Sequence, residues 1–183
     1  MSTESADDAS AAVGERSTVD VDHRPARASS IAALVAAALS ALTSAPFATY
    51  AIPLGIGGVV ILAVGLFVRE ERAWVTFGAT GLFLSVLVSG IDGTAVELLL
   101  VSATGAAVAW DAGQHAVSLG EQLGRHTRTW RNEAFHVSSS VVVAMVAAAL
   151  GYGVYSAVGG VVPVGAATLL AVAVVFLAWA VRA

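Results

Sequence analysis

The sequence predicts an all-α, polytopic membrane protein with six transmembrane helices and with both termini in the cytoplasm. The first observation behind this fold class is the composition, which is 57% hydrophobic and only 12% charged. A soluble domain normally carries about a quarter charged residues. The second is a series of six apolar runs, and the third is the placement of the arginines between them. We therefore expect a multi-pass protein of the cell membrane whose main surroundings are the lipid bilayer.

The N-terminal segment, residues 1–29, is polar, rich in Ser, Asp and Ala, and has no periodic apolar face. Such a segment cannot bury enough apolar surface to offset the entropy that ordering would cost. We predict a disordered acidic cytoplasmic tail over 1–29 and a six-helix transmembrane domain over 30–183.

The six apolar runs differ in how well their lengths match a bilayer. A helix needs about 20 residues, within a range of about 17–25, to cross a hydrocarbon core of about 30 Å. The fifth and sixth runs fit this length, whereas the second, third and fourth are short. Pro46 weakens the first helix, so a re-entrant hairpin of the first two runs stays an alternative to two crossings. The runs are 30–49, 52–68, 73–89, 95–110, 137–158 and 161–181.

The basic residues set the expected orientation. The chain contains no lysine, and its arginines precede the first run, separate the second from the third and the fourth from the fifth, and end the chain. The other three connections contain no arginine. The positive-inside rule makes the arginine-bearing side cytoplasmic, and the pattern requires an even number of crossings whether or not the first two runs cross.

Small residues recur at four-residue spacing within the runs. Helices in lipid gain little from apolar contact with each other, so small side chains that allow close backbone approach are important for packing. We expect ordinary bundle packing at these positions. They are Ala33, Ala37 and Ala41, Ser85 and Ser89, Ala103 and Ala107, and Gly153 and Ala157.

Glu97 is the only acid inside an apolar run, and an intramembrane carboxylate is a functional-site hypothesis by default. It lies three residues after Thr94, however, in the Thr-x-x-Glu spacing of a capping box, in which both side chains satisfy free amides at a helix start. We predict helix capping by Thr94 and Glu97. Ion or proton handling by Glu97 remains the alternative.

The stretch 111–136 joins the fourth and fifth runs and holds three of the four histidines. Asp111 and His115 are four residues apart, which places them on one helix face. A zinc site needs at least three protein ligands, and His126 lies about 16 Å farther along a straight helix. We therefore predict no metal site, no cofactor and no intramembrane histidine. No catalytic motif such as G-x-S-x-G or H-E-x-x-H is present, and we expect no enzyme.

The same stretch has the 3.6-residue pattern of a cytoplasmic amphipathic helical connection. One arrangement is a hairpin, in which the fourth span continues, turns near 124–129 and returns as the fifth. The other is a separate helix lying flat in the headgroup region. Gly113, Gly120 and Gly124 each cost about 1 kcal/mol of helix propensity, so one unbroken helix is not expected.

The polar face of this connection is the best candidate for docking a partner. It carries Glu121, Arg125, Arg128 and Arg131, and Glu121 with Arg125 has the favourable i,i+4 order of an ion pair. The alternative is that these arginines serve only as topology signals.

The run W-D-A-G-Q-H-A-V-S-L-G-E-Q-L-G-R, residues 110–125, with the arginine-rich turn and final apolar pair after it, resembles a family of small, uncharacterised haloarchaeal integral membrane proteins. The absence of lysine and the acidic tail agree with this resemblance, which covers roughly residues 30–183. Genes of that family often lie beside those for MoxR-type AAA ATPases and von Willebrand A-like proteins. The resemblance implies a membrane component of an ATPase-assisted assembly or maturation system, and it brings no catalytic residues.

Two functions follow as expectations. The first is a non-enzymatic integral membrane scaffold or accessory subunit that docks a cytoplasmic protein partner of a MoxR-type ATPase system. The second is a small oligomeric transporter or channel, suggested by Pro46, Pro53 and the glycines at 55, 57 and 58. We expect no nucleic acid partner, and the sequence leaves the oligomeric state open.

Overall fold

A computed structural model describes residues 25–44, 49–123 and 130–157, and all of their regular secondary structure is helical. Five of the described helical segments are long and apolar enough to cross a membrane. The predicted tail up to residue 24, Pro46 and the sixth run 161–181 lie outside the described residues. The elements are α2 (Arg27–Ser44), α3 (Ala51–Val64) continued by the π-helix η2 (Gly65–Arg69), α4 (Arg72–Ile91), α5 (Val96–Leu123) and α6 (Trp130–Ala157).

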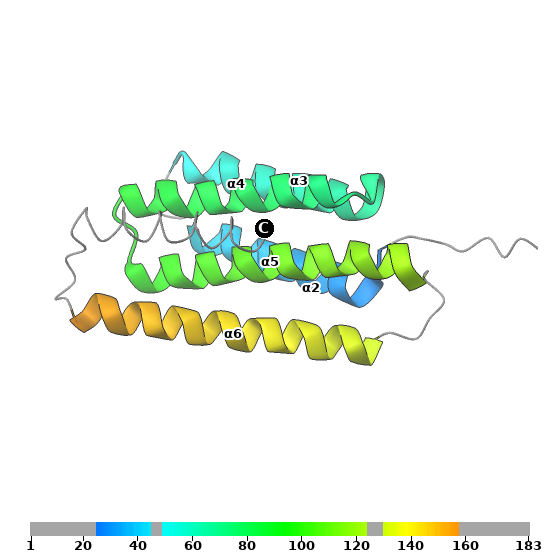
Figure 1. The fold of residues 1–183 in the computed structure, drawn as a ribbon. Helices are drawn as coiled ribbons and strands as arrows, with labels where there is room; N and C mark the ends of the chain where they lie inside the picture. Colours follow the sequence, from blue (N-terminus) through cyan, green and yellow to red (C-terminus); the bar gives the residue numbers. More distant parts are fainter. Residues whose placement is uncertain (1–24, 45–48, 124–129, 158–183) are drawn as a thin grey trace, which may run out of the picture.

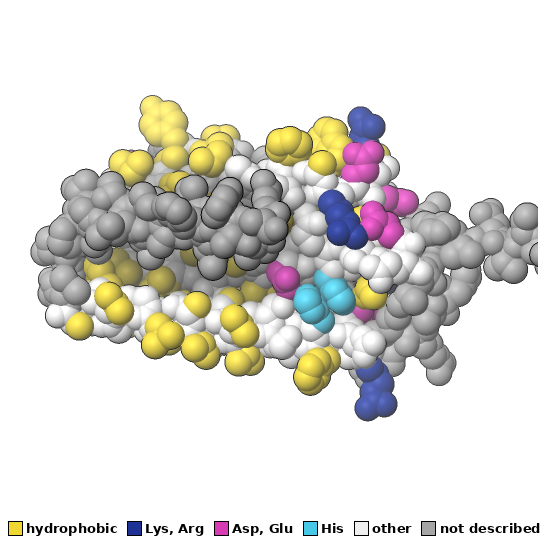
Figure 2. Space-filling model, viewed as in Figure 1, with side chains coloured by type: hydrophobic (Ala, Val, Ile, Leu, Met, Phe, Trp, Pro, Cys, Tyr) yellow, Lys and Arg dark blue, Asp and Glu magenta, His cyan; other side chains and the backbone are white. Residues whose placement is uncertain are grey.

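Successive helices run in opposite directions along one bundle axis (Figure 1). The start of α2, the end of η2, the start of α4, the end of α5 and the start of α6 therefore lie at the same end. Figure 2 shows that the described arginines gather in that half of the molecule, and apolar side chains cover much of the rest of the visible described surface. We call this the charged end. The structure thus agrees with the predicted segregation of arginines.

Residues 25–29, which the sequence assigned to the tail, belong to the helical bundle. The Ala26 amide donates a hydrogen bond of 3.0 Å to the Ala116 carbonyl of α5. The side chain of Ser29 is fully buried. The reason is tertiary: polar residues that show no apolar periodicity still become ordered when α5 and α6 supply hydrogen-bond partners.

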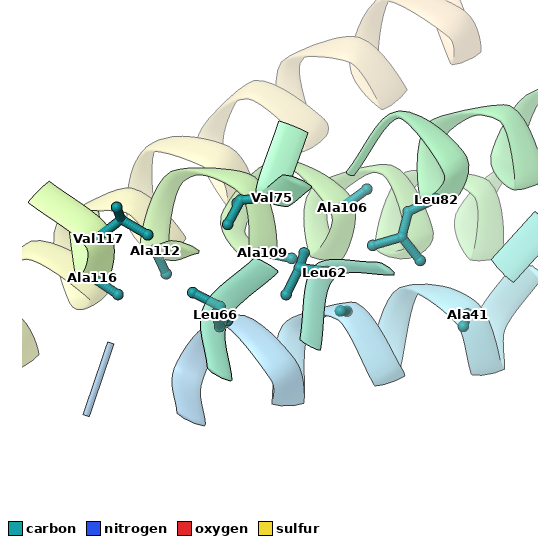
Figure 3. Close-up of a cluster of buried hydrophobic side chains, with 12 residues drawn as sticks. Ala41, Leu62, Leu66, Val75, Leu82, Ala106, Ala109, Ala112, Ala116 and Val117 are labelled. Atoms are coloured by element: carbon teal, nitrogen blue, oxygen red, sulfur yellow. The ribbon is translucent and has the colours of Figure 1, made fainter. Parts of the chain in front are cut away.

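The core lies between α2, α3, α4 and α5 and is built largely from small side chains (Figure 3). Ala33 and Ala37 of α2 are fully buried, as their four-residue spacing predicted. An added Cβ at Gly78 of α4 would lie only 2.5 Å from the amide nitrogen of Leu62 in α3. Small residues thus let the helix backbones approach closely, which in lipid is a principal source of helix association.

Buried serine hydroxyls link the same four helices near the end opposite the charged end. The Ser44 and Ser85 hydroxyl oxygens lie 2.9 Å apart, joining α2 to α4. Ser102 of α5 donates to the Ser40 carbonyl of α2 at 2.7 Å. Ser85 also donates to the Ala51 carbonyl at the start of α3, at 2.9 Å. In a bilayer core, where water is absent, these hydroxyls supply hydrogen bonds that water would otherwise make.

Helix α5 is much longer than the predicted fourth span 95–110, because it continues without a break to Leu123. Of the glycines that argued against a continuous helix, Gly113 and Gly120 are buried within α5, and Gly124 lies outside the described residues. A Cβ at Gly113 would lie 2.6 Å from Cγ1 of Val75 on α4. Close packing against α4 thus compensates for the helix propensity lost at Gly113. With α6 beginning at Trp130, the structure has the hairpin arrangement rather than a separate flat helix within the described residues.

Helix α6 stands apart from the four-helix core. It packs chiefly against α5 and at fewer positions against α2. Of residues 131–157, only Glu133 is buried. Gly151 and Gly153 have no neighbour within 4 Å of an added Cβ, unlike the core glycines. The small-residue spacing at Gly153 and Ala157 therefore makes no close helix contact among the described residues.

Candidate functional site

Four ionisable side chains meet between α5 and α6, toward the charged end. Asp111 and His115 come from α5, and Glu133 and His136 come from α6. We call this group the ionisable cluster. Figure 2 shows the histidines as a cyan patch beside a magenta carboxylate, in the same half of the molecule as the arginines. All four residues lie within helices, in the stretch 111–136 for which the sequence predicted a helical connection.

The two imidazole rings are stacked, with centroids 3.8 Å apart and an angle of 15° between their planes. Nε2 of His136 lies 3.0 Å from Oδ2 of Asp111, within ion-pair distance. The Nε2 atoms of both rings are buried and make no hydrogen bond. The His136 and Asp111 atoms are therefore close enough for a hydrogen bond, but their angle does not allow one. Ser140, one turn beyond His136, donates a hydrogen bond of 2.5 Å to the same Oδ2 atom.

Glu133 extends the cluster to α2. Its Oε2 atom accepts hydrogen bonds from the Ser29 backbone amide at 2.8 Å and from the Ser29 hydroxyl at 3.0 Å. The carboxylate is only 4% exposed and takes part in a further interaction as well. Ser29 lies in the first turn of α2, where amides lack helical partners and a carboxylate is favourable. Three helices are thus joined through one polar group of residues.

A groove of about 390 Å³ runs between α5 and α6 from this cluster toward the opposite end. Its walls are mostly small and apolar, including Ala107 and Val108 of α5 and Val143 and Ala144 of α6. Asp111 and Ser140 line the groove where it meets the cluster. The groove therefore gives the Asp111 carboxylate an apolar surface on one side.

The cluster contains the residue types of a metal site without its geometry. Within the part of the chain that the structure describes, no three His, Asp or Glu side chains are arranged to hold one metal ion. What the arrangement can do chemically is bind and release protons, because it brings two imidazoles and two carboxylates into contact in a helical, largely apolar setting.

The predicted docking residues are only partly described. Glu121 is exposed and pairs with Arg72 of α4 at 2.5 Å, so α4 supplies a partner that the sequence did not suggest. Arg131 is exposed in the first turn of α6. Arg125 and Arg128 lie outside the described residues. The structure thus places Glu121 and Arg131 at the charged end.

The predicted capping box at Thr94 and Glu97 does not make its reciprocal hydrogen bonds. The Thr94 hydroxyl is buried and has no partner, and the Thr94 amide donates to the Ser89 carbonyl at 3.1 Å. Glu97 is exposed and accepts a hydrogen bond of 3.2 Å from the Tyr152 hydroxyl of α6. The Thr94 amide thus bonds to the preceding helix α4 and the Glu97 carboxylate to the distant helix α6, instead of the two residues pairing with each other.

Two of the three glycines that suggested a broken transporter helix, Gly55 and Gly58, have packing roles. A Cβ at Gly55 would lie 3.4 Å from the Ala41 Cβ of α2, and one at Gly58 would lie 2.8 Å from the Gly78 carbonyl oxygen of α4. Gly57 has open space around it. Helix α3 runs continuously from Ala51, with Pro53 in its first turn, where proline is tolerated because the amide has no helical partner.

Sequence reasoning found half of the ionisable cluster and missed the other half. The i,i+4 spacing of Asp111 and His115 was visible, whereas Glu133 and His136 were not considered as a second pair. Their i,i+3 spacing places both on one face of α6. A hairpin centred near residue 125 brings those two faces together, and combining the hairpin with both spacings would have located the cluster.

The model of one protein family matches residues 23–178 of this chain. No curated protein and no solved structure matches it. The matched range spans most of the sequence and contains every helix and every residue of the ionisable cluster described above. The chain therefore belongs to DUF7519, a family of unknown function.

Proposed function

We propose that this protein is a non-enzymatic integral membrane scaffold or accessory subunit that docks a cytoplasmic protein partner at its charged end. The observation that carries the proposal is the division of the described surface. The described arginines gather at one end of the helical bundle, and large apolar side chains are exposed along its sides. The apolar sides suit lipid, which leaves the charged end as the surface that suits an aqueous partner.

The finer topology is part of the same proposal. Six crossings with both termini inside would place the charged end in the cytoplasm of a multi-pass cell-membrane protein, as the positive-inside rule requires. The lysine-free composition supports a haloarchaeal source. A MoxR-type ATPase system is the proposed partner because the family resemblance of residues 110–125 implies one.

The docking surface is proposed to include Glu121, Arg125, Arg128 and Arg131. Glu121 and Arg131 are both exposed at the charged end, and Arg125 and Arg128 lie between them in the sequence. Arginine suits such a surface because its planar fork of donors binds carboxylates at two points.

The test is affinity purification in mild detergent from the native cell, followed by mass spectrometry. Replacing Arg125, Arg128 and Arg131 with Gln should leave insertion intact and abolish recovery of a stoichiometric ATPase partner. The matched control replaces Arg16, Arg24 and Arg27 with Gln, which removes the same charge from the same predicted side. If the partner is recovered equally well with both triple variants, the docking proposal is wrong.

The alternative function, a small oligomeric transporter or channel, has a separate test. It predicts flux in liposomes that changes with Glu97→Gln. Absence of flux under any gradient, together with a stoichiometric partner, would favour the scaffold.

A further inference from the structure

We propose that Asp111, His115, Glu133 and His136 form a proton-binding site that controls how firmly α6 is held against α5 and α2. The proposal starts from how α6 is attached. Its only buried residue between 131 and 157 is Glu133. Beside the partly buried Val137, which packs against the core, the most deeply buried contact of α6 is therefore a polar one.

The polar contacts of α6 are concentrated in this cluster. They are the Glu133 hydrogen bonds to Ser29, the ring stack of His136, and the Ser140 hydrogen bond to Asp111. The remaining described hydrogen bond from α6 to another helix is that of Tyr152 to Glu97, toward the opposite end. A change of charge in the cluster therefore acts on most of the polar contacts that hold α6.

The cluster accommodates one proton on its imidazole pair and resists a second. A proton on Nε2 of His136 faces Oδ2 of Asp111 at 3.0 Å, and a small ring rotation would make a charge-assisted hydrogen bond. A second proton would place two positive rings face to face at 3.8 Å, where like charges repel. Histidine is the side chain whose charge ordinarily changes between about pH 5 and 8, so the second proton arrives on acidification.

The carboxylates that act on the imidazole pair come from two helices, with Asp111 on α5 and Glu133 on α6. Helix α2 contributes the uncharged amide and hydroxyl of Ser29, which bond to Glu133. The ion pair of Arg72 with Glu121 lies nearer the charged end, and Glu121 is about 9 Å along α5 from His115. The two carboxylates balance the net charge even of a doubly protonated imidazole pair, so acidification acts on α6 through the repulsion between the two stacked rings themselves.

The experiment measures the position of α6 directly. The chain contains no cysteine, so Ala73→Cys with Ala134→Cys places one spin-label pair on exposed positions of α4 and α6 at the charged end. Ala95→Cys with Ala149→Cys reports on the opposite end. Pulsed EPR distances are recorded in lipid nanodiscs from pH 8 to pH 5, on protein purified without a histidine tag.

The 73–134 distance should lengthen or broaden on acidification, and the 95–149 distance should change less. His115→Gln and His136→Gln should each abolish that response, whereas Glu97→Gln, which alters the other polar contact of α6, should retain it. The 95–149 distance at pH 7.5 shows whether a variant is folded.

A 73–134 distance that is constant from pH 8 to 5 in the otherwise native chain would overturn the proposal. A response that survives both histidine substitutions would overturn it as well, and so would a response that disappears in Glu97→Gln. The partner pull-down plays no part in this test, so docking and proton binding can fail independently.

Discussion

The four-helix core and α6 differ in the kind of contact that holds each of them in place. Helices α2 to α5 approach closely through alanine and glycine and bury Leu62, Leu66 and Leu82 between them. Helix α6 buries one carboxylate and exposes most of its apolar residues, with Val143 68% and Leu150 67% exposed. The comparison shows that apolar helices of similar composition in one chain can be held in place by different interactions. Close packing together with buried serine hydroxyls holds the core, whereas the one buried residue of α6 between 131 and 157 is a hydrogen-bonded carboxylate.

The largest expected difference comes from truncating a leucine in each region. Leu62 is fully buried, so Leu62→Ala should lower the free energy of unfolding by about 2–5 kcal/mol through a cavity. Leu150→Ala, at an exposed position of α6, should change it by less than about 0.5 kcal/mol. Unfolding by SDS titration in mixed micelles, followed by circular dichroism, measures both. Equal effects would show that the two regions are not distinguished by packing.

A glycine pair tests the backbone approach itself. Gly78→Ala puts a Cβ against the backbone of Leu62, and we expect a loss of about 1–3 kcal/mol in the free energy of unfolding. Gly151→Ala meets no neighbour and should leave that free energy unchanged or raise it, because alanine favours the helix. The same SDS titration measures both variants. An unchanged free energy of unfolding for Gly78→Ala would mean that α3 and α4 can move apart with little loss of stability.

The third comparison concerns the contact between α6 and the first turn of α2. Glu133→Ala removes an acceptor of the Ser29 amide and hydroxyl, and we expect a cost of about 1–2 kcal/mol for buried donors left without it. Hydrogen exchange should then speed up in α6 and in the first turn of α2, with the core amides unaffected. Glu97→Ala is the control because Glu97 is exposed. Faster exchange throughout the bundle would indicate that α6 also stabilises the core.

The smallest expected effect concerns the serine hydroxyls. Ser44→Ala removes the link from α2 to Ser85 of α4, and such interhelical hydrogen bonds average about 0.6 kcal/mol in membranes. Ser156→Ala of α6 is the matched control, since among the described residues its hydroxyl bonds to the Tyr152 carbonyl of its own helix. The SDS titration should show a free energy of unfolding slightly lower for Ser44→Ala than for Ser156→Ala. A loss above about 2 kcal/mol for Ser44→Ala would show that the serines act as one network.

Much of the fold could be predicted from the sequence because its signals are local. Hydropathy located the helices, and the expected second run 52–68 agrees closely with the observed segment Ala51–Arg69. The spacing of Ala33 and Ala37 identified a buried face. The positions of the arginines indicated which helix ends lie together, and Figure 2 shows the described arginines in one half of the molecule.

The candidate site could not be predicted in the same way because it depends on partners distant in sequence. Asp111 and His115 look like residues of a polar connection until Ser140 and His136 are placed beside them by the hairpin. Glu97 looked like a capping residue because its spacing from Thr94 is local, whereas its observed partner Tyr152 is 55 residues away. Local pattern and tertiary contact compete for the same side chain, and here the tertiary contact prevails.

By itself, the sequence determined that the described chain folds into apolar helices with its arginines at one end, because each of these properties follows from the transfer of local segments between water and lipid. Only the tertiary structure decided that α5 continues through its glycines, that residues 25–29 join the bundle, and that two histidines and two carboxylates meet between α5, α6 and α2. The physical reason is that a polar group in a helical membrane domain is stable only where another segment satisfies it. The identity of that segment is a property of the packed bundle.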